Sequence, residues 1–135
     1  MKPILVSAAV YFATVFAAGF VLGVLRTLVL EPWLGPVAAV ALELPVMLGI
    51  AWLACGSILR RRPLQPGQAA GMGLTALALL LLAEAALSVL LAGRTLAEHL
   101  ALYAQGAHQL GLGGQLLFAA WPVVRATAAQ PTRPR

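Results

Sequence analysis

The sequence predicts an all-α integral membrane protein, a bundle of four membrane-spanning helices with both the amino and the carboxyl terminus in the cytoplasm. Of its 135 residues, 61% are hydrophobic and 10% are charged, and the mean hydropathy is +0.93. Soluble domains are about 45 to 50% apolar and about 25% charged. The composition therefore excludes an ordinary water-soluble protein and indicates a chain that folds in a lipid bilayer.

Three apolar runs are long enough to cross a bilayer, because its hydrocarbon core of about 30 Å requires about 20 helical residues. They cover about residues 4–25, 37–59 and 69–92, and the second and third each contain one acid, Glu43 and Glu84. The first run is longer than the apolar region of a signal peptide, about 7 to 15 residues, and so predicts an uncleaved helix. The connections are short and contain proline and glycine, so residues 1–125 are expected to form a single transmembrane domain.

The fourth span is predicted over about residues 107–124, where the apolar run is only 15 residues long, from 110 to 124. Such a run crosses the bilayer only if its helix begins earlier, near Ala104. Just before it, apolar residues at helical spacing predict a short interfacial helix over about residues 95–106. Residues 126–135 have too little apolar content to pack, so a disordered tail is expected there.

The distribution of Lys and Arg favours four spans over three. With four spans and a cytoplasmic amino terminus, seven of the nine basic residues lie inside, and only Arg26 and Arg94 lie outside. With three spans the division becomes four inside and five outside. Because cytoplasmic loops carry an excess of Lys and Arg, the sequence predicts four spans and two cytoplasmic termini. This topology explains the net charge of +5 better than a nucleic-acid-binding patch does, so no nucleic-acid partner is expected.

Arg26, Glu43 and Glu84 form the candidate intramembrane polar site. A charged acid at mid-membrane costs about 2.5 to 3.5 kcal/mol on insertion scales, so each acid requires a partner, a proton or a function. Helical side chains tilt toward the amino end of their helix, which directs Arg26 and Glu43 toward each other. Glu84 has the poorest access to Arg26; Ser88, one turn on, is its candidate hydrogen-bond partner, and without a partner Glu84 is expected to stay protonated. Two interpretations remain open, a pair that joins the first two helices or a proton or cation site.

Three further residues are predicted to shape these helices. Gly19 and Gly23 precede Arg26 at helical spacing and open a face for close helix packing. Pro45, two residues after Glu43, removes one backbone hydrogen bond and crowds the preceding turn, which predicts a kink. The kink is either an ordinary feature of a membrane helix or part of an ion site beside the carboxylate.

The sequence has no pattern typical of a metal, cofactor or catalytic site. The one cysteine, Cys55, excludes an internal disulfide and any cysteine-based metal motif. His99 and His108 lie nine residues apart with only Glu98 at ligand spacing, which favours solvated interfacial histidines over a metal site. Phosphate loops, nucleophile elbows, zinc-protease motifs and dinucleotide fingerprints are missing, so neither enzyme activity nor a cofactor is expected.

The segment from Gly19 to Arg62 resembles a group of small bacterial inner-membrane proteins that carry no assigned function. The resemblance rests on Gly19-Phe-Val-Leu-Gly23, Arg26, Leu30-Glu-Pro32, Leu34-Gly35 and Glu43-Leu44-Pro45-Val46-Met47. It implies a multi-span protein of the bacterial inner membrane and no particular activity. The small multidrug exporters also have four spans and an intramembrane glutamate, but their essential acid is on the first helix, which has none here.

Two functions remain open. The first is a non-catalytic accessory or assembly protein, in contact with the bilayer and with a membrane-protein partner, whose polar groups serve helix packing. The second is a proton- or cation-coupled carrier of a small molecule that uses Glu43 and Glu84. Such a carrier is expected to form a homo-oligomer, because four short helices enclose little volume.

Overall fold

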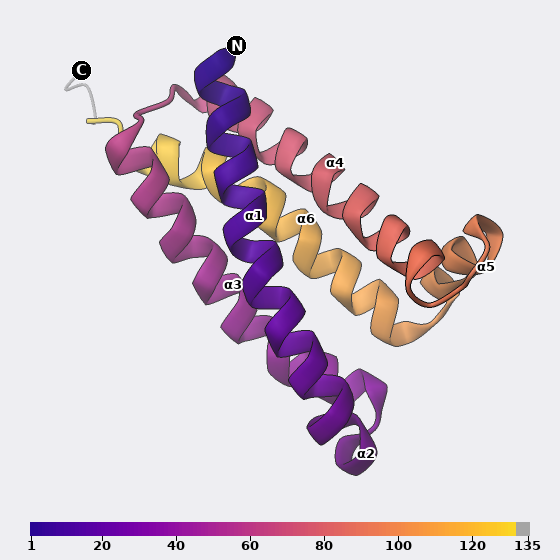
Figure 1. The fold of residues 1–135 in the computed structure, drawn as a ribbon. Helices are drawn as coiled ribbons and strands as arrows, with labels where there is room; N and C mark the ends of the chain where they lie inside the picture. Colours follow the sequence, from indigo (N-terminus) through magenta and orange to yellow (C-terminus); the bar gives the residue numbers. More distant parts are fainter. Residues whose placement is uncertain (132–135) are drawn as a thin grey trace.

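The computed structural model describes residues 1–131, and all the regular secondary structure in that range is helical. Among the described residues, four α-helices are long and two are short, and Figure 1 shows how they are arranged. In chain order the elements are α1 (Lys2–Leu25), a π-helical segment η1 (Arg26–Leu30), α2 (Glu31–Leu34), α3 (Pro36–Arg61), α4 (Pro66–Leu90), α5 (Leu96–Ala101), a 3-10 turn η2 (Leu102–Ala104) and α6 (Gly106–Ala128).

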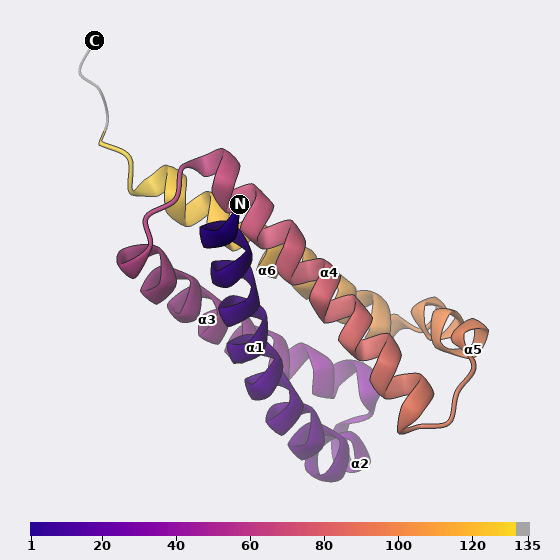
Figure 2. The ribbon, with the colours of Figure 1, turned by 45° about the horizontal axis from the view of Figure 1, so that its top comes forward.

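The four long helices form a bundle in which α1 and α6 lie on a diagonal. Helix α1 packs against α3 and α4, and α6 packs against the same two helices. The start of α1 and the end of α6 lie at one end of the bundle, here named the terminal end, and α2 and α5 lie at the other, named the α2/α5 end (Figures 1 and 2). The chain therefore runs the length of the bundle four times.

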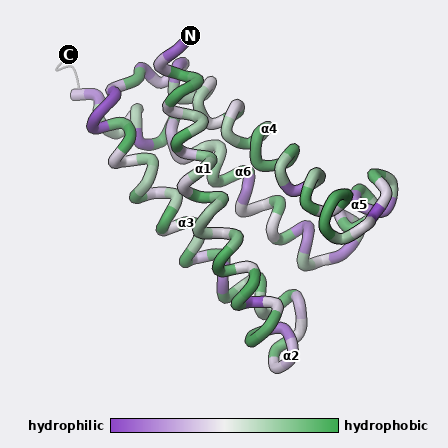
Figure 3. The backbone as a smooth tube through the Cα atoms, viewed as in Figure 1, coloured by the Kyte–Doolittle hydropathy of each residue, from purple (hydrophilic) through white to green (hydrophobic). Residues whose placement is uncertain are grey.

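Three of the long helices have the length and apolar composition of membrane spans, which makes this a membrane protein. Within residues 1–131 these segments are Lys2–Leu34, Pro36–Arg61 and Pro66–Leu90. Hydrophobic residues predominate along them, as Figure 3 shows. Helix α6 is long enough at 23 residues but is not among the three, because its sequence contains four glycines, two glutamines and a histidine.

The predicted boundaries differ from the observed ones mainly at the first connection and at the tail. The first helix continues through η1 and α2 to Leu34 and turns only at Gly35, whose φ of 81° suits a residue without a side chain. Pro32 does not end the helix, because a proline in the first turn of α2 needs no backbone hydrogen bond. Helix α6 continues to Ala128, so residues 126–128 of the predicted disordered tail are helical. Residues 129–131 of that tail follow the end of the helix, and residues 132–135 lie outside the described residues.

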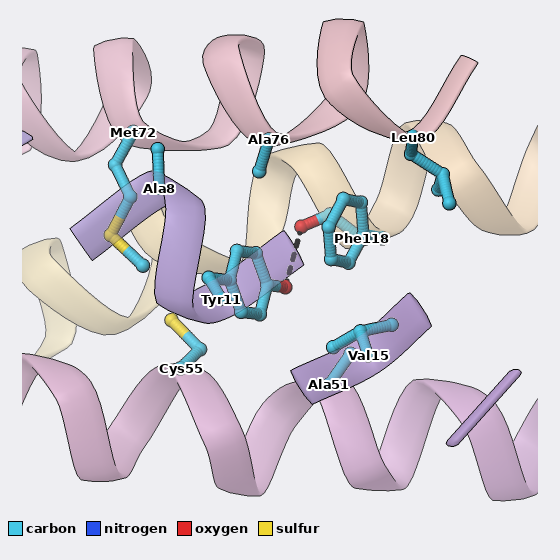
Figure 4. Close-up of a cluster of buried hydrophobic side chains, with 9 residues drawn as sticks. All are labelled: Ala8, Tyr11, Val15, Ala51, Cys55, Met72, Ala76, Leu80 and Phe118. Atoms are coloured by element: carbon cyan, nitrogen blue, oxygen red, sulfur yellow. Dashed lines mark hydrogen bonds between the residues drawn. The ribbon is translucent and has the colours of Figure 1, made fainter. Parts of the chain in front are cut away.

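The buried core fills the half of the bundle nearer the terminal end. Its centre is Tyr11, fully buried on α1, whose hydroxyl donates a 2.8 Å hydrogen bond across the diagonal to the carbonyl of Phe118 on α6 (Figure 4). The two rings also stack, with centroids 4.4 Å apart. Cys55 and Met72 pack around this pair from α3 and α4. A buried tyrosine needs a partner for its hydroxyl, so this bond fixes the diagonal spacing of α1 and α6.

Two glycines allow the close approach of α6 to its neighbours. A Cβ added at Gly73 of α4 would overlap the backbone carbonyl of Ala119, and one added at Gly114 would overlap the side chain of Leu44. Small residues at helix contacts let backbones approach closely in membrane proteins. The contacts of α6 with α4 and α3 therefore depend on these two positions.

Candidate functional site

A cavity of about 830 Å³ occupies the other half of the bundle, toward the α2/α5 end. All four long helices line it, together with η1, α2, α5 and η2. Its volume falls within the range of about 300 to 1,000 Å³ that is typical of small-molecule sites. Arg26, Glu43 and Glu84 all line this cavity, so the structure brings the three predicted site residues together around one space.

Arg26 contacts two carboxylates. Its Nη1 donates to Glu43 Oε2 at 2.7 Å, which is the predicted contact between the first two long helices. Its Nε donates to Glu31 Oε1 at 3.2 Å, a contact that the sequence analysis missed. The side chain of Glu43 is 12% exposed, whereas those of Arg26 and Glu31 are 27% and 29% exposed. Glu43 is thus the more deeply buried of the two acids that neutralise the guanidinium.

The π-helical segment explains how Glu31 reaches Arg26. Glu31 donates its backbone N–H to the carbonyl of Arg26, five residues earlier, which is the hydrogen bond that defines a π turn. In a regular α-helix, residues five apart point in different directions, but the wider π turn brings them to one side. The available sequence signal is Pro32, which cannot donate to the carbonyl four residues before it and therefore interrupts the α-helical hydrogen bonds at this point.

Glu84 has a partner on α6 rather than on its own helix. Gln115 Nε2 donates to Glu84 Oε1 at 2.6 Å. The expectation that Ser88 would hydrogen-bond Glu84 is wrong, because Ser88 Oγ instead accepts from Arg94 Nη1 at 3.5 Å. Gln115 was missed because it lies 31 residues along the chain, and only the packing of α4 against α6 brings the two side chains together.

The two histidines also line the cavity, and the expectation that both are solvated is wrong for His99. His99 on α5 is buried, whereas His108 at the start of α6 is half-buried. The ring of Tyr103 meets both imidazoles edge to face, with centroids 5.7 Å from His99 and 6.2 Å from His108. Burial, and then the nearby Glu84 carboxylate, raise the pKa of Tyr103 above its usual value, so its phenol stays neutral.

The three residues predicted to shape the helices have different surroundings. A Cβ added at Gly19 would lie 3.2 Å from Met47 Cε, so α1 and α3 approach closely there. A Cβ added at Gly23 would have only Nη2 of Arg26, on the same chain segment, within 4.0 Å. Gly23 therefore lines the cavity, and the expected close packing of another helix at this position is wrong. Pro45 lies within the continuous helix α3 and is not among the residues that line the cavity.

Near the terminal end, Arg125 packs against α3 in a contact that the sequence analysis did not predict. Its guanidinium lies 4.0 Å from the centre of the Trp52 ring and donates from Nη2 to the Trp52 carbonyl at 3.2 Å. A Cβ at Gly56 would approach this guanidinium to 2.7 Å. Trp121, one turn before Arg125, donates to the carbonyl of Leu48 at 3.1 Å. These contacts join α6 to α3 by polar groups that face into the bundle.

Comparisons with protein-family models, with curated proteins and with solved structures give no match. Within residues 1–131, no three His, Cys, Asp or Glu side chains gather into a possible metal site. The cavity combines an apolar wall, three carboxylates with partners on other elements, and a set of hydrogen-bonding groups at the α2/α5 end.

Proposed function

We propose that this protein is a multi-pass protein of the bacterial cytoplasmic membrane in which α1, α3, α4 and α6 all cross the bilayer and both termini face the cytoplasm. One supporting observation is that α1 begins and α6 ends at the same end of the bundle (Figure 1). Another is that the 23 residues of α6, at about 1.5 Å each, extend about 34 Å, enough for a hydrocarbon core. We also propose that it belongs to the group of small inner-membrane proteins that residues 19–62 resemble.

Reporter fusions test this topology. Fusions after Gln65 and after Arg135 are expected to report the cytoplasm, and a fusion after Arg94 is expected to report the periplasm. A periplasmic signal from the carboxyl-terminal fusion would leave α6 on one side of the membrane and would refute the fourth crossing.

The function that the geometry supports best is a proton- or cation-coupled carrier of a small molecule. Such a carrier is not an enzyme. The observation that carries this proposal is that Glu43 and Glu84, the two acids within apolar helices, line one cavity of about 830 Å³. A small molecule in that space would lie beside both acids, so its binding and the binding of a proton or cation would affect each other. In this topology the cavity opens in the outer half of the bilayer. Because a bundle of four short helices encloses little volume, the carrier is proposed to work as a homo-oligomer.

A specific observation favours the second function, an accessory or assembly protein. Arg26 is paired with Glu31 and Glu43, and Glu84 is hydrogen-bonded to Gln115, so each of these groups already joins two elements of the bundle. Polar groups that serve only to hold helices together need no ligand. In that case the membrane partner of the protein would be another protein, and the cavity would have no role.

The substitution Glu84→Gln separates the two functions. A glutamine at this position can still accept the hydrogen bond from Gln115 but cannot carry a charge or release a proton. The matched control is Glu98→Gln, the same change at an exposed acid outside the cavity, where glutamine can still cap α5. Both variants are expressed in a strain that lacks the gene, and their folding is checked by thermal unfolding in detergent.

If the protein is a carrier, wild type and Glu98→Gln restore the wild-type phenotype to the strain that lacks the gene. Glu84→Gln folds but fails to restore it. If Glu84→Gln restores the phenotype as well as wild type, the carrier is refuted and the accessory function stands. The molar mass of the purified protein in detergent gives a second measurement, because a monomer would contradict the proposed homo-oligomer.

A further inference from the structure

Three polar atoms around the cavity are shielded from solvent and have no hydrogen-bond partner among the described residues. They are Nδ1 of His99, Nδ1 of His108 and Oε1 of Gln115. His99 is more than nine-tenths buried, with 7% of its surface exposed. Buried polar groups in proteins are nearly always hydrogen-bonded. Their convergence on one cavity therefore points to a ligand that supplies hydrogen bonds.

The charges around the cavity indicate the sign of that ligand. With both histidines counted as neutral, the lining holds one more carboxylate than guanidinium: Glu31, Glu43 and Glu84 against Arg26 and Arg94. Arg26 is shared by Glu31 and Glu43, and the exposed Arg94 donates to Ser88. Glu84 is thus the acid without a basic partner in direct contact, which favours a cationic ligand.

The hydrogen-bonding groups beside Glu84 agree with this sign. Gln115 uses its amide nitrogen to donate to Glu84 Oε1, so its own oxygen can only accept a hydrogen bond. Glu84 has a second oxygen that can also accept. A group that carries a positive charge and several N–H donors satisfies both residues, whereas a carboxylate or phosphate satisfies neither.

The rest of the wall is apolar and has room for a hydrophobic body. It includes Phe16 and Phe20 of α1, Leu44 of α3, and Leu80 and Leu87 of α4. We propose that the cavity binds an organic cation: a small molecule with an apolar body and a protonated amine that donates to Glu84 and to Oε1 of Gln115. This inference rests on the proposed carrier function and names the class of its substrate.

Binding to the full-length protein in detergent tests the inference with three probes that share one body. The probes are 4-phenylbutylamine, 4-phenylbutanol and 4-phenylbutyrate, which present a cation, a neutral hydroxyl and an anion. Isothermal titration is expected to show that the amine binds at least about tenfold more tightly than the alcohol or the carboxylate. Glu84→Gln is expected to reduce the amine's affinity to that of the alcohol.

Two glycines of α6 provide a matched pair of variants for the cavity. A Cβ at Gly111 or at Gly113 would meet no atom within 4 Å, but only Gly111 lines the cavity. Gly111→Phe is expected to fill the cavity and abolish amine binding, whereas Gly113→Phe is expected to leave it unchanged. The inference is overturned if the three probes bind equally, if the carboxylate binds best, or if amine binding survives both Glu84→Gln and Gly111→Phe.

The binding experiment and the complementation experiment can fail separately. If the amine does not bind but Glu84→Gln fails to restore the wild-type phenotype, the proposal of an organic cation as substrate is refuted and the carrier function remains. If the amine binds as expected but Glu84→Gln restores the phenotype fully, the binding site stands and the carrier is refuted.

Discussion

Removal of the Arg26 side chain is expected to destabilise the bundle by leaving two acids without their partner. Arg26→Ala leaves the carboxylates of Glu43 and Glu31 unpaired, close to each other and beside the apolar wall of the cavity. In the intact protein the Glu43 side chain is 12% exposed to solvent and the Glu31 side chain is 29% exposed. Breaking one side of a buried ion pair costs about 3 to 5 kcal/mol, whereas exposed pairs contribute about 0 to 1 kcal/mol. For this partly buried group we expect a loss of about 2 to 3 kcal/mol in the free energy of unfolding.

The structure also predicts which second substitution restores stability. Glu43 is the closer and more buried acid, at 2.7 Å from Arg26 against 3.2 Å for Glu31. Arg26→Ala combined with Glu43→Gln is therefore expected to recover more than half of the loss, and adding Glu31→Gln is expected to recover little more. Reversible unfolding in mixed detergent micelles, followed by tryptophan fluorescence, measures these differences. Arg94→Ala is the control, because its exposed guanidinium makes only a 3.5 Å contact, and it should change stability by less than about 0.5 kcal/mol.

Two results would refute this reasoning. If Arg26→Ala is as stable as Arg94→Ala, the ion pair contributes nothing to folding. If the double variant loses the sum of the two single losses, Arg26 and Glu43 are not coupled, since contacting residues deviate from additivity by about 0.5 to 3 kcal/mol.

Two further predictions concern the packing of α6. Gly73→Ala places a methyl group on the Ala119 carbonyl and should cost about 1 to 3 kcal/mol, whereas Gly113→Ala, which meets no atom within 4 Å, should be neutral or stabilising by up to about 1 kcal/mol. Equal thermal stability of the two variants would contradict the close approach of α4 and α6. Tyr11→Phe keeps the ring stack on Phe118 but loses the 2.8 Å hydrogen bond, so it should cost about 0.5 to 1.5 kcal/mol in the same unfolding assay. An unchanged stability would mean that this bond does not hold α1 to α6.

Local features of the sequence were sufficient to predict the helices and one ion pair. Each span is an apolar run with at most one charged residue, and its length must match a bilayer, so composition alone locates the segments now seen as α1, α3 and α4. Arg26 and Glu43 lie 17 residues apart on consecutive helices, on either side of the turn at Gly35. Because the connection between these helices is short, they pack side by side. The tilt of helical side chains then brings the two groups together.

Tertiary structure decided the rest of the candidate site. The partner of Glu84 is on α6, the burial of His99 depends on how α5 lies against the bundle, and the contact of Arg26 with Glu31 requires a π turn. Apolar residues surround each long helix on most sides, so the sequence pattern does not indicate which face meets which neighbour. That choice is made by small residues such as Gly73 and Gly114, which permit close contact only on one side. The helices therefore follow from composition, whereas the cavity exists only because of which helix faces are in contact.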